Sequence, residues 1–299
     1  CGMKTDRWIV SEPEKVVQAV ERMKPRHFVS GPVIVNQMLE SNIKDMKFLS
    51  TFAGGGESLS IEQEKKVNSY LHNKGYNGNY VTGYGMTECC ATVCTGMQGF
   101  YKEGTLGIPL PKVNMKIIDP ENGQERKYGE EGEICFCAPN IMVGYFKNPK
   151  ETDNIIKVHA DGKKWIHTGD LGSVNQDGFL RFQGRIKKIY LTKGSDNSVY
   201  KLFPMEIENV LSRHSAVDKC AVVGRLNGEK GYLVIAYVTL KSKDIGDNVE
   251  KELRQLCRQE LKENSWPFEY HFVEKLPTTG AGKIDFRTLE KWAENSDSF

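Results

Sequence analysis

The stretch Gly83-Tyr84-Gly85-Met86-Thr87-Glu88 follows a run of strand-forming residues, Tyr80-Val81-Thr82, and decides how the chain is interpreted. Its glycines let the backbone approach a ligand closely and take positive φ. Tyr84 offers an aromatic face to a purine, Thr87 a hydroxyl to a phosphate oxygen, and Glu88 a hard oxygen ligand suited to Mg²⁺. A plain turn with a packed tyrosine and a solvated glutamate is the alternative. For the hexapeptide alone, that structural alternative is the stronger one.

A second glycine-rich stretch, Ser50–Ser60, contains Gly54-Gly55-Gly56. The apolar run Lys47–Phe52 leads into it as a strand, and helix formers fill residues 61–74 after it, which is typical of an α/β layer. Three consecutive glycines indicate a backbone constraint, so the loop can lie against a flat base or an acyl tail. A flexible loop capped by Ser60 explains the same residues, and explains them better when the loop is taken alone.

Two motifs further along place polar groups beside expected strand ends. Thr168-Gly169-Asp170 follows the expected strand Trp165-Ile166-His167, and an aspartate at a strand end can accept hydrogen bonds from both hydroxyls of a ribose. An Asp-Gly-type turn is the alternative. We assign no role to His167. Gly184-Arg185-Ile186-Lys187 indicates either ligand contact at a domain hinge or a solvated basic edge.

The segment Pro277–Lys283 contains Gly-Ala-Gly-Lys and looks like a phosphate-binding P-loop. It fails that test because the first glycine of the pattern would fall at Pro277 and the residue after the lysine is Ile284, where the pattern needs Ser or Thr. A lysine flanked by glycine can still deliver a point charge to a developing phosphoryl or carboxylate charge.

The pattern of apolar and turn-forming residues along the chain predicts an α/β protein with two domains. Residues 1–184 are expected to form the first, with an α/β part at 1–103, including a helix over 13–24, and a β-rich subdomain at 104–184. Residues 185–299 are expected to form a small α+β domain. Its elements are helices at 204–213 and 249–263 and strands at 219–223, 232–240 and 269–273.

Composition limits the function classes. With 41 basic and 39 acidic residues the formal charge is +2, which gives no reason to expect nucleic acid or an anionic membrane as a partner. No stretch approaches the roughly 20 apolar residues of a membrane span, so we expect a cytoplasmic protein. The eight cysteines form no C-x-x-C pair, which argues against a zinc or disulfide scaffold and for reduced core residues. The first residue, Cys1, suggests a fragment or a processed product.

Taken together and in order, these motifs resemble the adenylate-forming superfamily of acyl-CoA synthetases, luciferases and carrier-protein adenylation domains. The resemblance covers nearly the whole chain, as the C-terminal part of such an enzyme, and two further matches support it. One is Gly132-Glu133-Ile134-Cys135 followed by Pro139, Met142, Gly144-Tyr145, Pro149 and Thr152; the other is the helix start Pro204–Glu208.

The resemblance implies that a carboxylic acid attacks the α-phosphate of Mg·ATP, and that a thiol of coenzyme A or of a carrier protein's phosphopantetheine then displaces AMP. It also assigns nucleotide-contacting residues. Gly56, Glu57 and Ser58 would border the adenine, Tyr84 would stack on it, Asp170 would hold the ribose diol, and Phe182 and Arg185 would lie beside the ribose.

For the chemical steps, the resemblance implies that Thr87 contacts phosphate, Glu88 binds Mg²⁺ and Lys283 bridges the carboxylate and α-phosphate oxygens. Lys187 matches the hinge about which the small lid domain rotates between the two half-reactions. Gly194 matches a glycine near the pantetheine path.

Two departures from the family pattern qualify these expectations. The link Ser195–Phe203 is longer than usual, which puts the thiol-side contacts in doubt. Residues 1–50 hold no Ser/Thr/Gly-rich phosphate loop, so we expect activity in a full-length parent and not in this chain alone. The alternatives are an enzyme that adenylates an amino acid or another acid and loads it on a carrier protein, and an inactive nucleotide-binding remnant. The apolar run Val29–Met38 and Phe52–Gly54 fit part of an acyl pocket or plain core.

Overall fold

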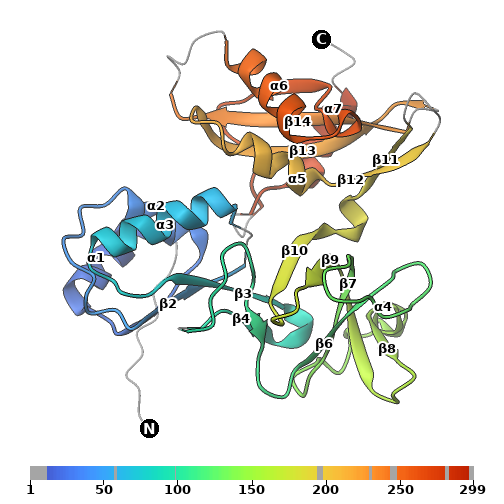
Figure 1. The fold of residues 1–299 in the computed structure, drawn as a ribbon, viewed down its shortest axis with the longest axis horizontal. Coiled ribbons are helices and arrows are strands. Elements are labelled where there is room, and N and C mark those ends of the chain that lie inside the picture. The colour runs from blue at the N-terminus through green and yellow to red at the C-terminus, as the bar shows by residue number, and fades with distance from the viewer. Residues whose placement is uncertain are drawn as a thin grey trace. The chain divides into compact units, whose positions relative to one another are not determined.

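A computed structural model describes residues 12–56, 59–97, 99–193, 198–228, 231–242, 248–279 and 283–295 (Figure 1). It has the mixed α/β architecture expected from the sequence. The chain divides into two compact units, of which the first comprises Cys1–Thr168 with Ser173–Phe182 and the second Gly169–Gly172 with Gln183–Phe299. Among the helices in the described ranges, none is both long enough and apolar enough to cross a membrane.

The first sheet of unit 1 is a five-stranded sheet with three helices. Its strands follow chain order, β1 (His27–Val29), β2 (Thr51–Gly54), β3 (Tyr80–Met86), β4 (Ala91–Thr95) and β5 (Ile108–Pro109). The first three are parallel and the last two are antiparallel to their neighbours. The helices are α1 (Pro13–Met23), α2 (Pro32–Leu39) and α3 (Ile61–Asn73), and Figure 1 shows them grouped beside β2.

Local sequence explains these helices. Pro13 and Pro32 occupy first-turn positions, where the missing N–H costs nothing. Ser60 and Gln63 form a reciprocal capping box at the start of α3, as the loop interpretation of Ser60 predicted. The run Val29–Met38 contributes Ile34, Val35 and Met38 to the core shared by the helices and β2, which favours core over an acyl pocket for those three.

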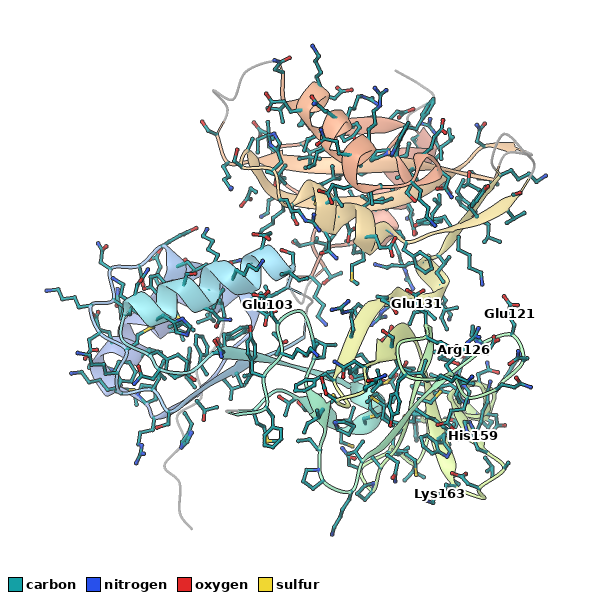
Figure 2. All side chains as sticks on the ribbon, in the orientation of Figure 1. Glu103, Glu121, Arg126, Glu131, His159 and Lys163 are labelled. Atoms are coloured by element: carbon teal, nitrogen blue, oxygen red, sulfur yellow. The ribbon has the colours of Figure 1, made fainter. Side chains whose placement is uncertain are left out.

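The second sheet has the order β10-β9-β7-β6, with β8 paired to β9. Its bounds are β6 (Asn114–Ile118), β7 (Gly132–Cys137), β8 (Ile156–Val158), β9 (Lys164–Val174) and β10 (Leu180–Arg185), and α4 (Pro149–Ile155) precedes β8. The turn between β8 and β9 carries His159 and Lys163, which Figure 2 labels. Strand β9 begins in unit 1 and contributes Gly169–Gly172 to unit 2.

Unit 2 is a three-stranded sheet with helices on both faces. The sheet contains β13 (Val217–Leu226), β14 (Tyr232–Leu240) and β15 (Glu269–Phe272). Helices α5 (Pro204–Leu211) and α6 (Val249–Glu260) share one core with Val222 and Ala236, and α7 (Phe286–Asn295) shares the other with Ala221 and Ile235. Alternate residues of each strand therefore face opposite cores.

An antiparallel strand pair includes part of the long link before α5. Strand β12 (Val199–Leu202) pairs antiparallel with β11 (Tyr190–Lys193), with Tyr190 opposite Leu202. Residues 199–202 of the link thus belong to a two-stranded sheet. Gly194, expected near the pantetheine path, lies outside the described residues.

Candidate functional site

The motif Gly83–Glu88 continues strand β3 to Met86, and the 3₁₀ turn η1 (Thr87–Cys89) follows. The chain then reverses sharply, since Cys90 and Ala91 have φ of 54° and 113°, values that non-glycine residues rarely adopt. Gly85 is required by this close return, because a Cβ there would lie 1.9 Å from the Ala91 carbonyl oxygen. The reversal leaves η1 and its glutamate at the end of β3.

Tyr84 is buried in the core between the two sheets of unit 1. It is 8% exposed, and its ring stacks on Phe136 with a centroid distance of 5.6 Å and an interplanar angle of 25°. Phe182 lies tilted at 6.4 Å, so the structure brings together two of the residues expected at the nucleotide. This packing favours the structural alternative for one face of the ring. Stacking of Tyr84 on adenine stays a prediction.

Glu88 is half-buried and held by the loop before α4. The Tyr145 hydroxyl donates to Glu88 Oε1 at 2.6 Å, and the Met142 amide donates to the Glu88 carbonyl at 2.8 Å. Asn140 Nδ2 donates to the next carbonyl, that of Cys89, at 2.6 Å. Burial, followed by the bond to Glu88, raises the pKa of Tyr145 to about 12, so the phenol stays a donor at neutral pH.

The sequence predicts only part of the set of residues that hold Glu88 in place. Tyr145 belongs to the Gly144-Tyr145 match but had no assigned role, and Asn140 was not singled out. No spacing rule links either to Glu88, because the contact joins two loops 57 residues apart.

The glycine-rich stretch that begins at the end of β2 lies very close to neighbouring atoms. A Cβ on Gly54 would lie 1.8 Å from Tyr80 Oη and 2.4 Å from the Ser30 carbonyl, so only glycine fits there. Gly56 is exposed and has φ of 92°. Thr87, the expected phosphate contact, is exposed on η1. Glu57 and Ser58, expected beside the adenine, lie outside the described residues.

Asp170 lies inside β9 and not at its end, which corrects the expectation from the sequence. Gly169 takes φ of 69°, but the strand continues to Val174 because β9 lies between β7 and β10 in the sheet. Asp170 is 6% exposed, and its Oδ1 is 3.2 Å from Nε of Arg185, whose side chain is 67% exposed. The expected ribose ligand and its expected neighbour are therefore an ion pair within unit 2.

Next to Arg185, the 3₁₀ turn η2 (Ile186–Lys188) carries two lysines in different environments. Lys187, the expected hinge residue, is exposed, whereas the Lys188 ammonium lies 3.0 Å from the centroid of the Phe286 ring. Burial lowers the pKa of Lys188 to about 8. Burial also raises the pKa of Glu208, whose Oε1 accepts from the Val222 amide at 2.8 Å, to about 7. Sequence patterns had identified neither Lys188 nor Glu208 as a perturbed group.

Lys283 is exposed on the segment between β15 and α7. Its carbonyl accepts from the Thr279 amide at 2.7 Å, and the Asp285 amide donates to the Pro277 carbonyl at 2.8 Å. These bonds pair residues 277–279 with residues 283–285, and the Lys283 side chain is exposed to solvent. Residues 280–282 lie outside the described ranges.

Two family models match the chain. The model described as AMP-binding enzyme matches residues 4–146, and the model described as AMP-binding enzyme C-terminal domain matches residues 206–283. They cover the β3 motif of unit 1 and the Lys283 segment of unit 2, respectively.

Curated and solved proteins agree with these models. The long-chain-fatty-acid–CoA ligase of Salmonella typhimurium is 35% identical over 82% of this chain and 40% of its own length, and that of Bacillus subtilis is 30% identical over 95% and 49%. The structure of Bacillus subtilis o-succinylbenzoate CoA synthetase, in complex with an acyl-adenylate intermediate, superposes with a TM-score of 0.77 at 25% identity, over 93% of this chain and 53% of that one. The chain thus spans less than half the length of either curated relative. It belongs to the adenylate-forming superfamily of AMP-binding enzymes.

Proposed function

We propose that a protein containing this chain is an AMP-forming acid–thiol ligase. In the first step a carboxylate oxygen of the acid forms a bond to the α-phosphorus of ATP, and the bond to pyrophosphate breaks. In the second step the thiol sulfur of coenzyme A bonds to the acyl carbon, AMP leaves, and the thiol proton is released. The chain spans 40% and 49% of the two curated relatives, so the proposal concerns a polypeptide that also supplies the remaining portion.

The observation that carries the proposal is the pairing of buried Asp170 with exposed Arg185 at 3.2 Å. An exposed guanidinium can turn into solvent, so the carboxylate that it contacts can accept hydrogen bonds from other donors. The two neighbouring hydroxyls of a ribose can each donate a hydrogen bond to the same carboxylate, which has two acceptor oxygens. We therefore assign Asp170 to the ribose diol and Arg185 to the ribose edge and the adjacent phosphate.

Glu88 has the chemistry that a magnesium ligand requires. Mg²⁺ prefers carboxylate oxygen and is usually held by one or two carboxylates together with substrate phosphates. Tyr145 engages Oε1 and orients the group, so Oε2 can point to the cation. When bound, Mg²⁺ would neutralise phosphate charge, while Thr87 would contact a phosphate oxygen from the same turn.

The second unit supplies the cations in this proposal. Lys283 would approach the carboxylate and α-phosphate oxygens in the first step and stabilise the charge that develops on them. Residues 185–299 would act as a lid that turns about Lys187, so that Lys283 is replaced by the thiol path near Gly194 in the second step. Adenine would lie between Tyr84 with Phe182 and the loop Gly56–Ser58.

The activities of the two curated relatives guide the substrate proposal. Both curated relatives are long-chain-fatty-acid–CoA ligases, which supports a fatty acid as the acid and coenzyme A as the acceptor. We retain a carrier protein's phosphopantetheine as the rival acceptor, since it presents the same thiol arm. A cytoplasmic location also stays a prediction.

The test compares this chain with a chimera that places the N-terminal portion of the Bacillus subtilis ligase ahead of it. Hydroxamate formation with ATP, Mg²⁺ and a series of fatty acids reports adenylation, and thioester formation reports the acceptor. Acyl-CoA formation by the chimera supports the proposal. Transfer to a carrier protein but not to coenzyme A would show that the carrier protein, and not coenzyme A, is the acceptor. A chimera with a native circular dichroism spectrum that adenylates no acid would leave only the nucleotide-binding remnant.

A further inference from the structure

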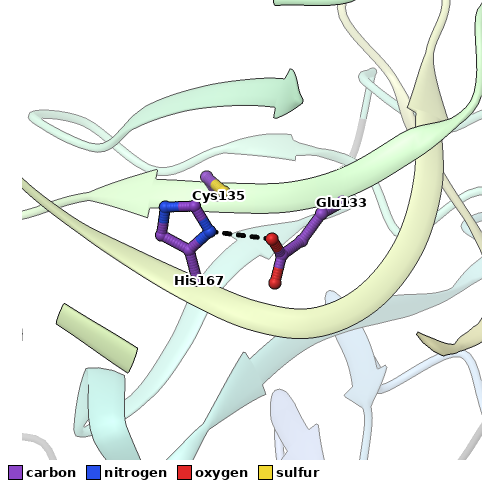
Figure 3. Close-up of side chains that lie close together, drawn as sticks. All are labelled: Glu133, Cys135 and His167. Atoms are coloured by element: carbon purple, nitrogen blue, oxygen red, sulfur yellow. Dashed lines mark hydrogen bonds and ion pairs between the residues drawn. The ribbon is translucent and has the colours of Figure 1, made fainter. Parts of the chain in front are cut away.

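Three potential metal ligands from two neighbouring strands meet on one face of the second sheet. Glu133 and Cys135 lie two residues apart on β7, so they share a face, and His167 lies on the adjacent strand β9. The residue between them, Ile134, points to the opposite face and into the core with Phe136. Figure 3 shows the three side chains turned toward one another.

The ligand atoms are close enough for one cation. The Glu133 carboxylate oxygen, the Cys135 sulfur and the His167 ring nitrogen all lie within 4.8 Å of one another. Nδ1 of His167 is 2.7 Å from Oε2 of Glu133. Tetrahedral Zn²⁺ has bonds of about 2.0–2.2 Å to nitrogen and oxygen, which separates two such ligands by roughly 3.4 Å. The pair therefore has to open by less than an ångström.

The histidine ring is already oriented as a ligand ring usually is. His159 Nε2 is 2.9 Å from Nε2 of His167, so one hydrogen bond links the two imidazoles and leaves Nδ1 of His167 facing Glu133. His159 is itself fixed by stacking on Trp165, with centroids 5.5 Å apart and an interplanar angle of 16°. Metal-binding histidines commonly use their second ring nitrogen in such a bond, which sets the tautomer and the ring angle.

The surroundings are sheltered but accessible. Cys135 is fully buried, and the side chains of Glu133 and His167 are each 12% exposed. Such shielding limits competition from water while a path to solvent remains. Lys116 lies over the Trp165 ring at 4.0 Å on the same face, and its charge opposes a cation. We therefore expect weaker binding than at an all-cysteine structural site.

We propose that Glu133, Cys135 and His167 form a binding site for Zn²⁺, separate from the Mg²⁺ role assigned to Glu88. A thiolate and an imidazole select a borderline-soft cation over Mg²⁺, which prefers oxygen ligands alone. The Cys135 thiol gives up its proton to solvent when the ion binds, and the resulting thiolate and the carboxylate together carry two negative charges, which the ion balances. Three protein ligands leave a fourth position for water. Because the ligands join β7 to β9, the bound ion links these two strands.

Sequence spacing does not reveal this site. Zinc motifs place their ligands at short, regular intervals in the sequence. Cys135 and His167 instead lie on strands β7 and β9, and α4 and β8 come between these strands in the chain. The absence of C-x-x-C pairs therefore argued against a zinc scaffold but could not exclude ligands that meet across strands.

The experiment titrates this chain with Co²⁺ and, separately, with Zn²⁺. Co²⁺ reports a thiolate ligand through its sulfur-to-metal charge-transfer band, and native mass spectrometry with Zn²⁺ reports stoichiometry. We expect one ion per chain, a charge-transfer band, and a melting temperature that rises with Zn²⁺. Cys135→Ala should abolish the band, and His167→Gln and Glu133→Gln should each weaken Co²⁺ binding at least tenfold.

Two matched variants control for adventitious binding. Cys90→Ser removes the exposed thiol of the same unit, and His214→Gln removes the histidine of the Glu252–His214 pair, whose separation is 3.0 Å. Both should keep the band and the rise in melting temperature. The proposal is overturned if Zn²⁺ fails to bind, if the band survives in Cys135→Ala, or if Cys90→Ser removes it. If Cys135→Ala does not fold, the more exposed Glu133→Gln decides by the same titration.

Discussion

Two pairs of carboxylates, one pair in each unit, are held in different ways. In unit 1, Glu64 and Glu88 each accept a hydrogen bond from a tyrosine hydroxyl, Tyr101 at 2.7 Å and Tyr145 at 2.6 Å. In unit 2, Asp170 pairs with the Arg185 guanidinium. Burial raises the pKa of Glu208, and the positive charge of the Lys188 ammonium opposes that rise. A neutral donor orients a carboxylate without cancelling its charge, whereas a cation balances it.

This difference bears directly on the proposed chemistry. A carboxylate that keeps its full negative charge suits a divalent cation, as proposed for Glu88. A carboxylate balanced by an exposed, exchangeable arginine suits neutral hydroxyl donors, as proposed for Asp170. The buried Glu64 shows the cost of the first arrangement, because burial raises its pKa despite bonds from Tyr101 and the Gly104 amide. The comparison predicts which substitutions alter charge and which alter only orientation.

The largest effect is expected where a cation of unit 2 meets reacting oxygens. Lys283→Ala in the chimera should slow adenylation about 10² to 10³-fold, the range for removing one stabilising donor from a developing charge. Thioester formation from a supplied acyl-adenylate should be nearly unchanged. The exposed Lys275, changed to Ala, is the control for general loss of positive charge. Equal loss of both half-reactions would contradict the role of Lys283.

The next effect separates charge from orientation in unit 1. Glu88→Gln keeps an acceptor for Tyr145 but removes the charge, so the Mg²⁺ concentration for half-maximal adenylation should rise about 10 to 100-fold. Tyr145→Phe keeps the charge of Glu88 but removes the hydrogen bond that orients it. The Mg²⁺ concentration for half-maximal adenylation should therefore rise less, about tenfold or below. Magnesium titrations of hydroxamate formation measure both. A larger effect in Tyr145→Phe than in Glu88→Gln would reverse the interpretation.

A smaller effect concerns the pH dependence of unit 2. The pKa of Glu208 is raised from 4.5 to about 7 by burial, so the folded chain binds more protons than the unfolded chain between these values. This contribution to the free energy of unfolding is therefore full below about pH 4.5 and declines as pH rises to about 7.

Glu208→Gln stays neutral throughout and should remove about 2 to 3 kcal/mol of the loss in the free energy of unfolding between pH 5 and pH 7.5, given about 1.4 kcal/mol for each pKa unit. Urea unfolding of this chain at pH 5 and pH 7.5 measures the change. The exposed Glu206, changed to Gln, should leave the slope as in the wild type. An identical slope in Glu208→Gln would show that another group titrates.

The smallest effect is expected for the exposed member of the unit 2 ion pair. Arg185→Gln should reduce the free energy of unfolding by less than about 1 kcal/mol, because a guanidinium that is 67% exposed is well solvated without its partner. AMP affinity, measured by calorimetry on the chimera, should fall more than stability does. A loss of stability above about 2 kcal/mol would mean that the pair is structural.

Several elements could be predicted from sequence because their signals are local. The helix over 13–24 appears as α1 with Pro13 in its first turn, and the strand at 232–240 has the predicted bounds. Patterns were less reliable where a strand passes through a polar motif. Gly169 suggested a turn, yet β9 continues through Asp170, because hydrogen bonding within the sheet outweighs the preference of one glycine.

The sequence by itself determined the chemical groups and their order: the carboxylates Glu88 and Asp170, the cations Arg185 and Lys283, and the family to which these motifs belong. Only the tertiary structure decided what each group touches. Tyr145 reaches Glu88, Arg185 reaches Asp170, and His167 meets Cys135 across strands. Backbone preferences act over a few residues, whereas these contacts depend on which strands become neighbours and in which register.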